Sequence, residues 1–165
     1  MGKQETGDTA WSLQQRTVLV GVDFSECSRS AFNKAREWLN GYRGRIVVLH
    51  VIDKSFTDKC IQHKLGTEAQ IKKSLFLEAK AKLKEFLDLE PAAEVPVEVL
   101  VCEGVPFMEI NKKALEYQAD LIVIGRCGRA ADMDTLFFGS TAERVLRFIT
   151  RPVLCVPPDT EYRRG

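Results

Sequence analysis

Two glycine-containing segments with neighbouring hydroxyl groups are the residues of this chain best suited to hold a ligand. The first segment follows an apolar run at residues 121–124 and comprises Gly125, Arg126, Cys127 and Gly128; the second comprises Gly139, Ser140 and Thr141. Glycine permits close approach to the backbone and positive φ, and peptide N–H groups at a helix start can hold an anion. The pattern therefore predicts a cradle for the phosphates of a nucleotide.

A carboxylate stands where the first apolar run ends, in the sequence Val22-Asp23-Phe24-Ser25. In an open parallel sheet, ligands lie beyond the carboxyl ends of the strands, at the point where the strand order reverses. If this run and the run at 121–124 form adjacent strands, Asp23 faces the first glycine segment and can accept hydrogen bonds from a ribose hydroxyl. The alternative is a carboxylate that only supports the following helix start, with Ser25 or Ser28 as the cap.

Simpler roles are open to the glycine segments as well. Glycines after a strand often form only a tight turn, so the local pattern alone leaves a turn and a phosphate site open. Ser140 and Glu143 match a capping box. We therefore expect the Ser140 and Thr141 hydroxyls to cap a helix whether or not a nucleotide is present.

The elements that must position these residues alternate between strand and helix periodicity. We expect strands at residues 17–22, 45–52, 95–102, 121–125 and 152–156, and helices at 28–40, 67–89, 106–117 and 140–148. The first, second and fourth strands are near-continuous apolar runs, as in parallel strands that are covered on both faces. Residues 53–66 are predicted to be a long polar connector. The chain is thus expected to adopt an α/β fold.

Length and composition suit one domain at residues 16–158, between solvated tails at 1–15 and 159–165. The formal net charge of +1, and lysines without interleaved aromatic residues, argue against a nucleic-acid partner. There is no apolar stretch of membrane-spanning length and no secretory signal pattern. We expect a cytoplasmic protein without a membrane role.

The five cysteines include no CxxC pair and no zinc-type spacing. Most are expected to be buried as small hydrophobic residues. Cys127 lies near Arg126 and Arg129, which favour a thiolate, but we expect it to be a bystander thiol. His50 and His63 have no paired ligand at metal-binding spacing, so no histidine metal site is expected.

Several of these motifs, taken together over residues 17–157, resemble the universal stress protein family. The motifs are Val22-Asp23-Phe24-Ser25, His50-Val51, Glu103-Gly104-Val105-Pro106 and the glycine pattern Gly125, Gly128, Gly139-Ser140. The resemblance implies a doubly wound, five-stranded parallel sheet of order 3-2-1-4-5 with helices on both faces. This is a Rossmann-like fold of the adenine nucleotide alpha hydrolase-like type, in which strands one and four are neighbours.

The resemblance also implies a ligand and its contacts. Nucleotide-binding members of the family hold ATP, and the matching positions here place Asp23 on the ribose and Val51 near the adenine. Ile124 is expected on the base or ribose side, and Val22 and Phe24 flank Asp23. The phosphates would be surrounded by Gly125, Arg126, Gly128, Arg129, Gly139, Ser140 and Thr141.

One departure from the family's ATP-binding pattern concerns the loop between the second and third glycines. The family has nine residues there, whereas ten residues separate Gly128 from Gly139 here, including Asp132 and Asp134. Two carboxylates repel a triphosphate unless Mg²⁺ or the loop's arginines compensate. We expect the loop to bulge outward and to leave the three glycines in place.

Three functions follow as hypotheses. The leading one is a stress-response sensor or regulatory module that binds an adenine nucleotide, as ATP, ADP or AMP, with or without Mg²⁺. The second is a slow Mg²⁺-dependent ATPase or nucleotidyl transferase that uses Asp132 or Asp134; the sequence has no Walker P-loop and no evident residue to activate water. The third is a nucleotide-free signalling module that acts through protein contacts.

The last predicted strand suggests how the protein associates. It is short, apolar and bracketed by Pro152 and Pro157, as suits the edge of a sheet. In the family that the chain resembles, this edge pairs across a two-fold axis. We therefore expect a homodimer formed through Val153, Leu154 and Val156.

Overall fold

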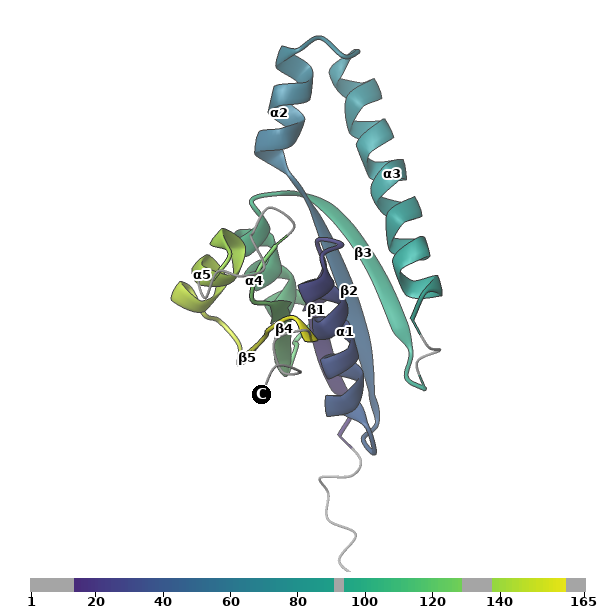
Figure 1. Cartoon of the computed structure of the whole chain (residues 1–165), viewed down its shortest axis with the longest axis vertical. Helices are drawn as coiled ribbons and strands as arrows, with labels where there is room; N and C mark the ends of the chain where they lie inside the picture. The colour runs from purple at the N-terminus through teal and green to yellow at the C-terminus, as the bar shows by residue number, and fades with distance from the viewer. Residues whose placement is uncertain (1–13, 91–93, 129–137, 160–165) are drawn as a thin grey trace, which may run out of the picture.

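The computed structural model describes residues 14–90, 94–128 and 138–159. It contains ten elements, in the order β1 (Arg16–Gly21), α1 (Glu26–Leu39), β2 (Gly44–Asp53), α2 (Lys54–Gln62), α3 (Glu68–Asp88), β3 (Val97–Gly104), α4 (Pro106–Glu116), β4 (Leu121–Gly125), α5 (Ser140–Arg147) and β5 (Val153–Val156). The five strands form one parallel sheet of order β3-β2-β1-β4-β5 (Figure 1). The predicted strand order is confirmed.

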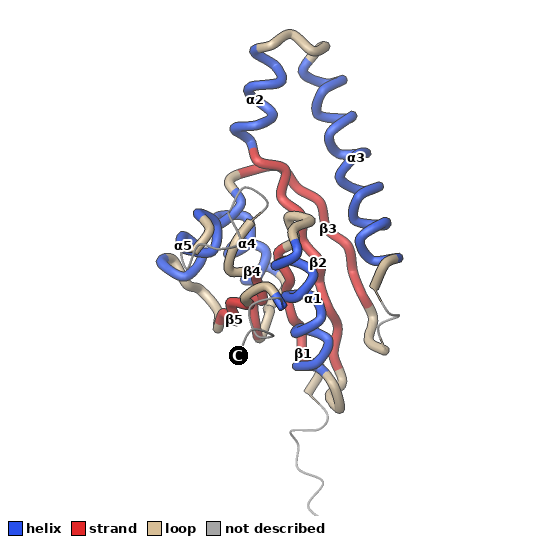
Figure 2. Tube along the Cα trace, viewed as in Figure 1, coloured by secondary structure: helices blue, strands red, loops and turns tan. Residues whose placement is uncertain are grey.

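The apolar runs of β1, β2 and β4 are buried because helices cover both faces of the sheet. Val18, Leu19 and Val20 have no exposed surface, and neighbouring side chains of β1 point to opposite faces. On one face, Val18 and Val20 pack in a core with side chains of α1 and α3. On the other face, Leu19 packs with side chains of α4 and α5 (Figure 2). This two-faced burial explains why the strands read as continuous rather than alternating apolar runs.

The segment at 53–66 differs from its prediction as a polar connector, because it contains helix α2. Asp53 caps this helix by accepting a hydrogen bond from the Ser55 N–H at 2.8 Å. Thr57 is the one buried residue of this helix, and the exposed Phe56 shows that its apolar side chains stay outside the core of the sheet. Figure 1 shows α2 and α3 as a hairpin that extends beyond the carboxyl end of the sheet.

The start of α5 also differs from its prediction. The N-cap residue is Gly139, with φ −63° and ψ 155°, and no side chain caps the helix. Ser140 is already the first helical residue, so its hydroxyl is not in the N-cap position that reaches the N–H groups of the first turn. The predicted Ser140–Glu143 capping box is therefore wrong, whereas a true capping box is present at Thr67 and Gln70 at the start of α3.

Candidate functional site

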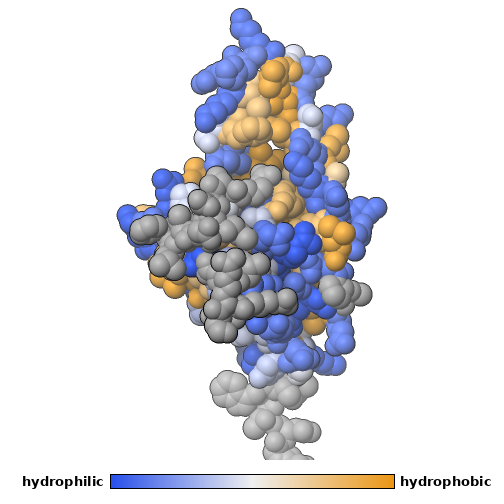
Figure 3. All heavy atoms as spheres, in the orientation of Figure 1, coloured by the Kyte–Doolittle hydropathy of each residue, from blue (hydrophilic) through white to orange (hydrophobic). Residues whose placement is uncertain are grey.

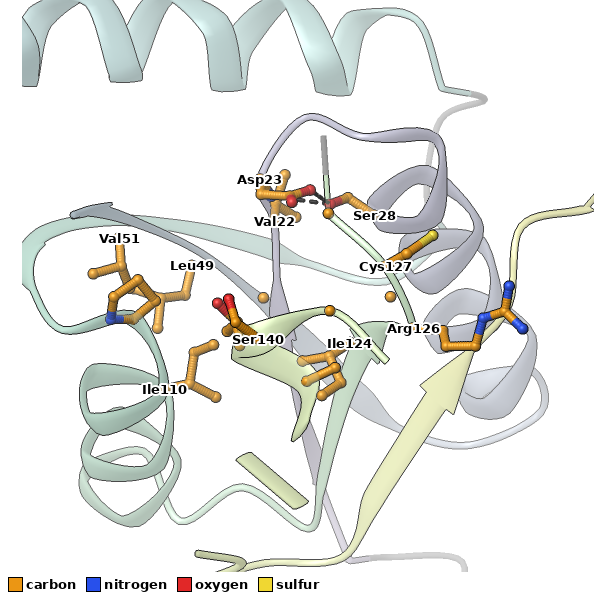
Figure 4. A pocket seen from close by; sticks show the side chains of 17 residues that line it. Val22, Asp23, Ser28, Leu49, Val51, Ile110, Ile124, Arg126, Cys127 and Ser140 are labelled. Atoms are coloured by element: carbon orange, nitrogen blue, oxygen red, sulfur yellow. Dashed lines mark hydrogen bonds between the residues drawn. The ribbon is translucent and has the colours of Figure 1, made fainter. Parts of the chain in front are cut away.

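A cavity of about 150 Å³ opens between the carboxyl ends of β1 and β4, where the strand order reverses (Figure 4). It is lined by Gly21, Val22, Asp23, Ser28, Leu49, Val51, Pro106, Ile110, Ile124, Gly125, Arg126, Cys127, Gly128, Gly139, Ser140, Thr141 and Ala142. The aspartate after β1 and both glycine segments thus line one cavity. Their meeting follows from the pairing of β1 with β4, which aligns Val20 with Val123.

The first wall of the cavity is built on Asp23, whose carboxylate is fixed by serines of the α1 start. Oδ1 accepts hydrogen bonds from the Ser25 N–H at 3.0 Å and from the hydroxyls of Ser25 and Ser28. The Asp23 N–H in turn donates to the Ser28 hydroxyl at 2.9 Å, and Ser25 is the N-cap of α1. This wall is held by side-chain hydrogen bonds, so the carboxylate has a set orientation.

The other carboxylate oxygen, Oδ2, faces the glycine segment. A Cβ placed on Gly128 would lie 2.8 Å from it. Within the described ranges no donor is recorded at Oδ2. The two roles considered from the sequence thus fall to two different atoms, because Oδ1 supports the helix start while Oδ2 is directed to the cavity.

The second wall consists of the glycine segments, and at its glycine positions there is no room for a side chain. A Cβ at Gly125 would lie 2.5 Å from the Cβ of Cys27, and one at Gly139 would lie 3.2 Å from the Gly128 nitrogen. None of these three glycines has a positive φ; among the described glycines only Gly41 and Gly66 do so. Glycine is required here for close approach, and not for backbone conformation.

Backbone hydrogen bonds hold the glycine wall in place. The Arg126 N–H donates to the Val156 carbonyl at 2.8 Å, and the Arg126 carbonyl accepts from the Gly139 N–H at 2.8 Å. The second glycine segment then runs directly into α5, whose first-turn residues Ser140 and Thr141 line the cavity. Free N–H groups at a helix start are suited to an anion.

The backbone of Arg126 lines the cavity, but its side chain does not point into it. Figure 4 shows it extending away from the cavity. Burial raises the pKa of the Cys155 thiol on β5, and the positive charge of Arg126 opposes that rise, so the guanidinium lies on the β5 side. The expectation that this side chain balances charge at ligand phosphates is therefore not supported, although the Arg126 backbone lines the cavity.

The floor of the cavity is apolar. Val22, Ile124 and Ile110 are each 4% exposed, and Val51, at the side of the cavity, is half-buried. Leu49, Pro106, Ile110 and Ala142 were not predicted as site residues. Pro106 belongs to a quoted motif, and Ile110 follows it by one helical turn in α4, so this spacing was the available signal. Such a surface suits the flat, weakly polar ring of a base.

A second cavity of about 590 Å³ continues from the first toward the α2–α3 hairpin and shares Asp23, Val51, Pro106, Gly128, Ser140 and Thr141 with it. Phe24 lines this outer part, with φ +67° and its ring centroid 4.5 Å from that of His50. Phe56 of α2 and Leu75 of α3 form the opposite side, and Figure 3 shows apolar surface between the two helices. The inner and outer parts together give room for a base, a sugar and phosphates.

Three predicted site residues lie outside the described residues: Arg129, Asp132 and Asp134. The outward bulge expected for their loop is likewise outside. In the described ranges, no group of three or more His, Cys, Asp or Glu side chains is arranged to hold a metal ion. No helix in those ranges has the length and apolar character needed to span a membrane.

The expectation of a bystander thiol at Cys127 is wrong. Cys127 forms a disulfide with Cys27 of α1, with a Cα–Cα distance of 6.1 Å, although 100 residues separate them in sequence. The two are 5% and 1% exposed. The remaining cysteines, Cys60, Cys102 and Cys155, are free thiols of intermediate exposure.

Comparison with known proteins agrees with this architecture. A family model described as Universal stress protein family matches residues 15–157. The chain belongs to the universal stress protein family. Universal stress protein MJ0577 of Methanocaldococcus jannaschii is 26% identical over 157 residues, covering 88% of this chain and 96% of its own.

Solved structures of universal stress proteins and related chains share the fold. The MJ0577 structure superposes with a TM-score of 0.73 at 27% identity, covering 86% of this chain and 94% of its own. The hypothetical protein PH0823 gives a TM-score of 0.68 at 32% identity, with the same coverage of 86% and 94%. A universal stress protein from Archaeoglobus fulgidus in complex with dAMP gives 0.60 at 21% identity, covering 87% and 98%, and at that identity the likeness shows the fold alone.

Proposed function

We propose that this universal stress protein is a cytoplasmic module that binds an adenine nucleotide, ATP first, in the cavity between β1 and β4. One observation carries the proposal: the Asp23 Oδ2 atom and the backbone of the glycine wall face each other across a space that a single Cβ at Gly128 would enter. A carboxylate and a set of peptide N–H groups, placed together over an apolar floor, match a ribose, phosphates and a base.

The roles that we assign follow from the atoms available. Asp23 accepts hydrogen bonds from the ribose hydroxyls through Oδ2. The N–H groups of Gly128, Ser140 and Thr141 hold the phosphates, because the Gly139 N–H already donates to the Arg126 carbonyl. Gly139 lets the backbone approach the ligand closely, and the adenine lies against Val51 and the apolar floor. The dAMP complex of a family member makes an adenine nucleotide the first ligand to test.

We assign the site to binding, and regulation through it, in preference to turnover. Capture of an anion by backbone N–H groups requires no general base. A Mg²⁺-dependent reaction would depend on Asp132 and Asp134, which lie outside the described residues. A nucleotide-dependent stress sensor is therefore the function that the described geometry supports best.

The test begins with the purified protein. Heat extraction followed by chromatography identifies any nucleotide carried through purification, and calorimetry with ATP, ADP and AMP measures affinity. Release of phosphate is followed in the same samples. We expect one nucleotide per chain and little or no hydrolysis.

A matched pair of variants locates the binding. Gly128→Glu adds bulk and a negative charge beside Asp23 and is expected to abolish the heat of binding. Gln62→Glu adds the same charge at an exposed position of α2 and is expected to bind like the wild type. An extract free of adenine nucleotide, together with no binding by the wild type, would refute the proposal; binding by Gly128→Glu would refute the assigned site.

We further propose that the protein forms a homodimer through β5. This strand is at the edge of the sheet, and its Leu154 side chain is 36% exposed. Phe148 and Ile149, just before the strand, are each 56% exposed, so the edge offers apolar surface. Light scattering is expected to give a dimer for the wild type and a monomer for Leu154→Lys; a monomeric wild type would overturn the pairing.

A further inference from the structure

The disulfide between Cys27 and Cys127 joins the two walls of the cavity. Cys27 is the second residue of α1, between the serines that fix Asp23. Cys127 lies between Arg126 and Gly128 and lines the cavity. No other covalent link is recorded between the walls in the described part of the chain. The bond therefore sits where movement of one wall relative to the other would change the site.

The packing around the bond makes the glycine wall dependent on it. The Gly125 backbone rests directly on Cys27, since a Cβ there would come within 2.7 Å of the Cys27 carbonyl carbon. The Cys127 Cα lies 3.3 Å from the Cβ position of Gly139. The disulfide thus restrains Cys127, which directly precedes Gly128 and packs against Gly139. The Gly128 N–H is one of the groups that we assign to the phosphates.

Burial restricts how the bond can be made or broken. With Cys27 1% and Cys127 5% exposed, a redox reagent reaches the sulfurs only when the first glycine segment moves or from the cavity that Cys127 lines. A ligand held in the cavity covers that approach. Bound nucleotide is therefore expected to slow disulfide exchange in both directions, which leaves its effect on the redox equilibrium as a separate quantity.

Two of the three free cysteines, Cys102 and Cys155, have surroundings less suited to this chemistry. Burial and the nearby Glu109 carboxylate raise the pKa of the Cys102 thiol to about 11. Burial also raises the pKa of Cys155. The reactive species is the thiolate, and helix N-terminal amides such as those around Cys27 stabilise one. The wall-joining pair is thus better placed for oxidation than Cys102 or Cys155.

We propose that Cys27 and Cys127 are a redox-active pair whose oxidation tightens nucleotide binding by holding the glycine wall in its ligand-ready shape. This inference rests on the proposed function, because the ligand is the adenine nucleotide assigned there. A preformed wall loses less conformational freedom when the nucleotide binds. In the dithiol form the wall keeps its backbone hydrogen bonds but loses the covalent tie to α1.

The oxidant is a small-molecule disulfide such as oxidised glutathione. One protein thiolate attacks a glutathione sulfur and releases one glutathione thiolate, which gives a mixed disulfide. The second protein thiolate then attacks the protein sulfur of that mixed disulfide and releases the second glutathione. In sum, two protein thiols and one oxidised glutathione give the protein disulfide and two reduced glutathiones, so atoms and electrons balance.

Thermodynamic reciprocity gives the proposal a second observable. If oxidation raises nucleotide affinity by some factor, nucleotide must favour the oxidised pair by the same factor. For a two-electron couple, a tenfold change corresponds to about 30 mV in reduction potential. ATP is therefore expected to make the pair easier to oxidise by that amount for each tenfold difference in affinity.

The experiment measures ATP affinity by calorimetry for the fully oxidised and fully reduced wild type. We expect at least tenfold tighter binding in the oxidised form. Cys27→Ser and Cys27→Ala, two variants with different packing, should bind like the reduced wild type in both buffers. Cys60→Ser, which removes a free thiol on α2, should keep the wild-type difference between the two forms.

The same samples are equilibrated in glutathione buffers with and without ATP, quenched with acid and alkylated, so that mass spectrometry reports the state of each cysteine. A Cys27–Cys127 disulfide that forms reversibly, with a midpoint shifted by ATP, supports the proposal. Cysteines that stay unlinked under oxidised glutathione, or equal ATP affinity in the two forms, would overturn it. If neither form binds ATP, the proposed function falls as well, which distinguishes the two failures.

Discussion

The two walls of the cavity are held in opposite ways. The Asp23 wall depends on side chains, because serine hydroxyls and a helix N-cap fix one carboxylate oxygen. The glycine wall depends on the lack of side chains, because Gly125 rests on Cys27 and Gly139 rests on Gly128. One wall is specified by hydrogen-bond partners, and the other by the space that any Cβ would occupy.

This difference predicts which changes each wall tolerates. On the Asp23 wall, one atom, Oδ2, is assigned to the ligand, and the hydrogen bonds that hold the carboxylate in place go to the other oxygen, Oδ1. On the glycine wall, different glycines serve stability and binding. A side chain at Gly125 would meet backbone atoms and destabilise the fold, whereas one at Gly128 would meet only the end of the Asp23 side chain and would interfere with the ligand. Four substitutions test this division, from the largest expected effect to the smallest.

Gly125→Ala should have the largest effect, on folding. Its Cβ would meet the Cβ and backbone of Cys27 at 2.5 and 2.7 Å, and a backbone neighbour cannot turn aside. We expect the free energy of unfolding to fall by about 3 kcal/mol, the upper range for overpacking. Urea unfolding under reducing conditions measures this. A loss below about 1 kcal/mol would show that the wall can accept a Cβ at Gly125, contrary to our interpretation.

Asp23→Ala should have the next largest effect, on both folding and binding. The Ser25 N–H and the Ser28 hydroxyl lose their shared acceptor, at a cost of about 2 kcal/mol in unfolding free energy. ATP affinity should fall at least about tenfold, or 1.4 kcal/mol, because the ribose acceptor is gone. Asp88→Ala, at an exposed site at the end of α3, should change neither quantity by more than about 0.5 kcal/mol.

Gly128→Ala should separate binding from folding. Its Cβ would have one close neighbour, the Asp23 Oδ2 atom at 2.8 Å. We expect an unfolding free energy within about 1 kcal/mol of the wild type, and an ATP affinity about tenfold weaker because the methyl group enters the ligand's space. If Gly128→Ala instead matched Gly125→Ala in stability loss and kept its affinity, the two glycines would have the same role and the distinction between them would be wrong.

Ser140→Ala should have the smallest effect. Ser140 is exposed and provides no capping hydrogen bond, so unfolding free energy should change by less than about 0.5 kcal/mol. Thr67→Ala removes a true capping box and should cost about 1 kcal/mol. ATP affinity of Ser140→Ala within about threefold of the wild type would indicate that the Ser140 N–H, and not its hydroxyl, serves the phosphates; a larger loss would assign that role to the side chain.

The sequence predicted most of the fold because its strong signals are local. The continuous apolar runs of β1, β2 and β4 mark buried parallel strands, and the family resemblance supplied the order that makes β1 and β4 neighbours. Helix α2 was missed because its few apolar residues, Phe56, Cys60 and Ile61, stand among polar ones, and Thr57 is the only residue that it buries. The Ser140 cap was wrong by one position, since a cap depends on the φ and ψ of one residue, which composition does not specify.

Long-range features of the site were harder to predict. Asp23 and the first glycine segment were brought together correctly because each stands at the end of a strand, β1 or β4, and the family resemblance made these strands neighbours. The Cys27–Cys127 pair was not predicted, because the two cysteines are 100 residues apart and carry no spacing signal. Ile110 and Leu49 read as ordinary core residues, since facing a cavity and facing the core require the same apolar side chain.

Arg126 ties the glycine wall to the edge of the sheet. Its N–H donates to Val156, the last residue of β5, and its carbonyl accepts from Gly139 at the start of α5. One residue thus stands between the chemistry of the pocket and the strand through which two copies would meet. If the proposed dimer forms through β5, a shift of the glycine wall on ligand binding would reach the interface through these two hydrogen bonds, so dimer affinity measured with and without ATP tests whether the pocket and the edge are coupled.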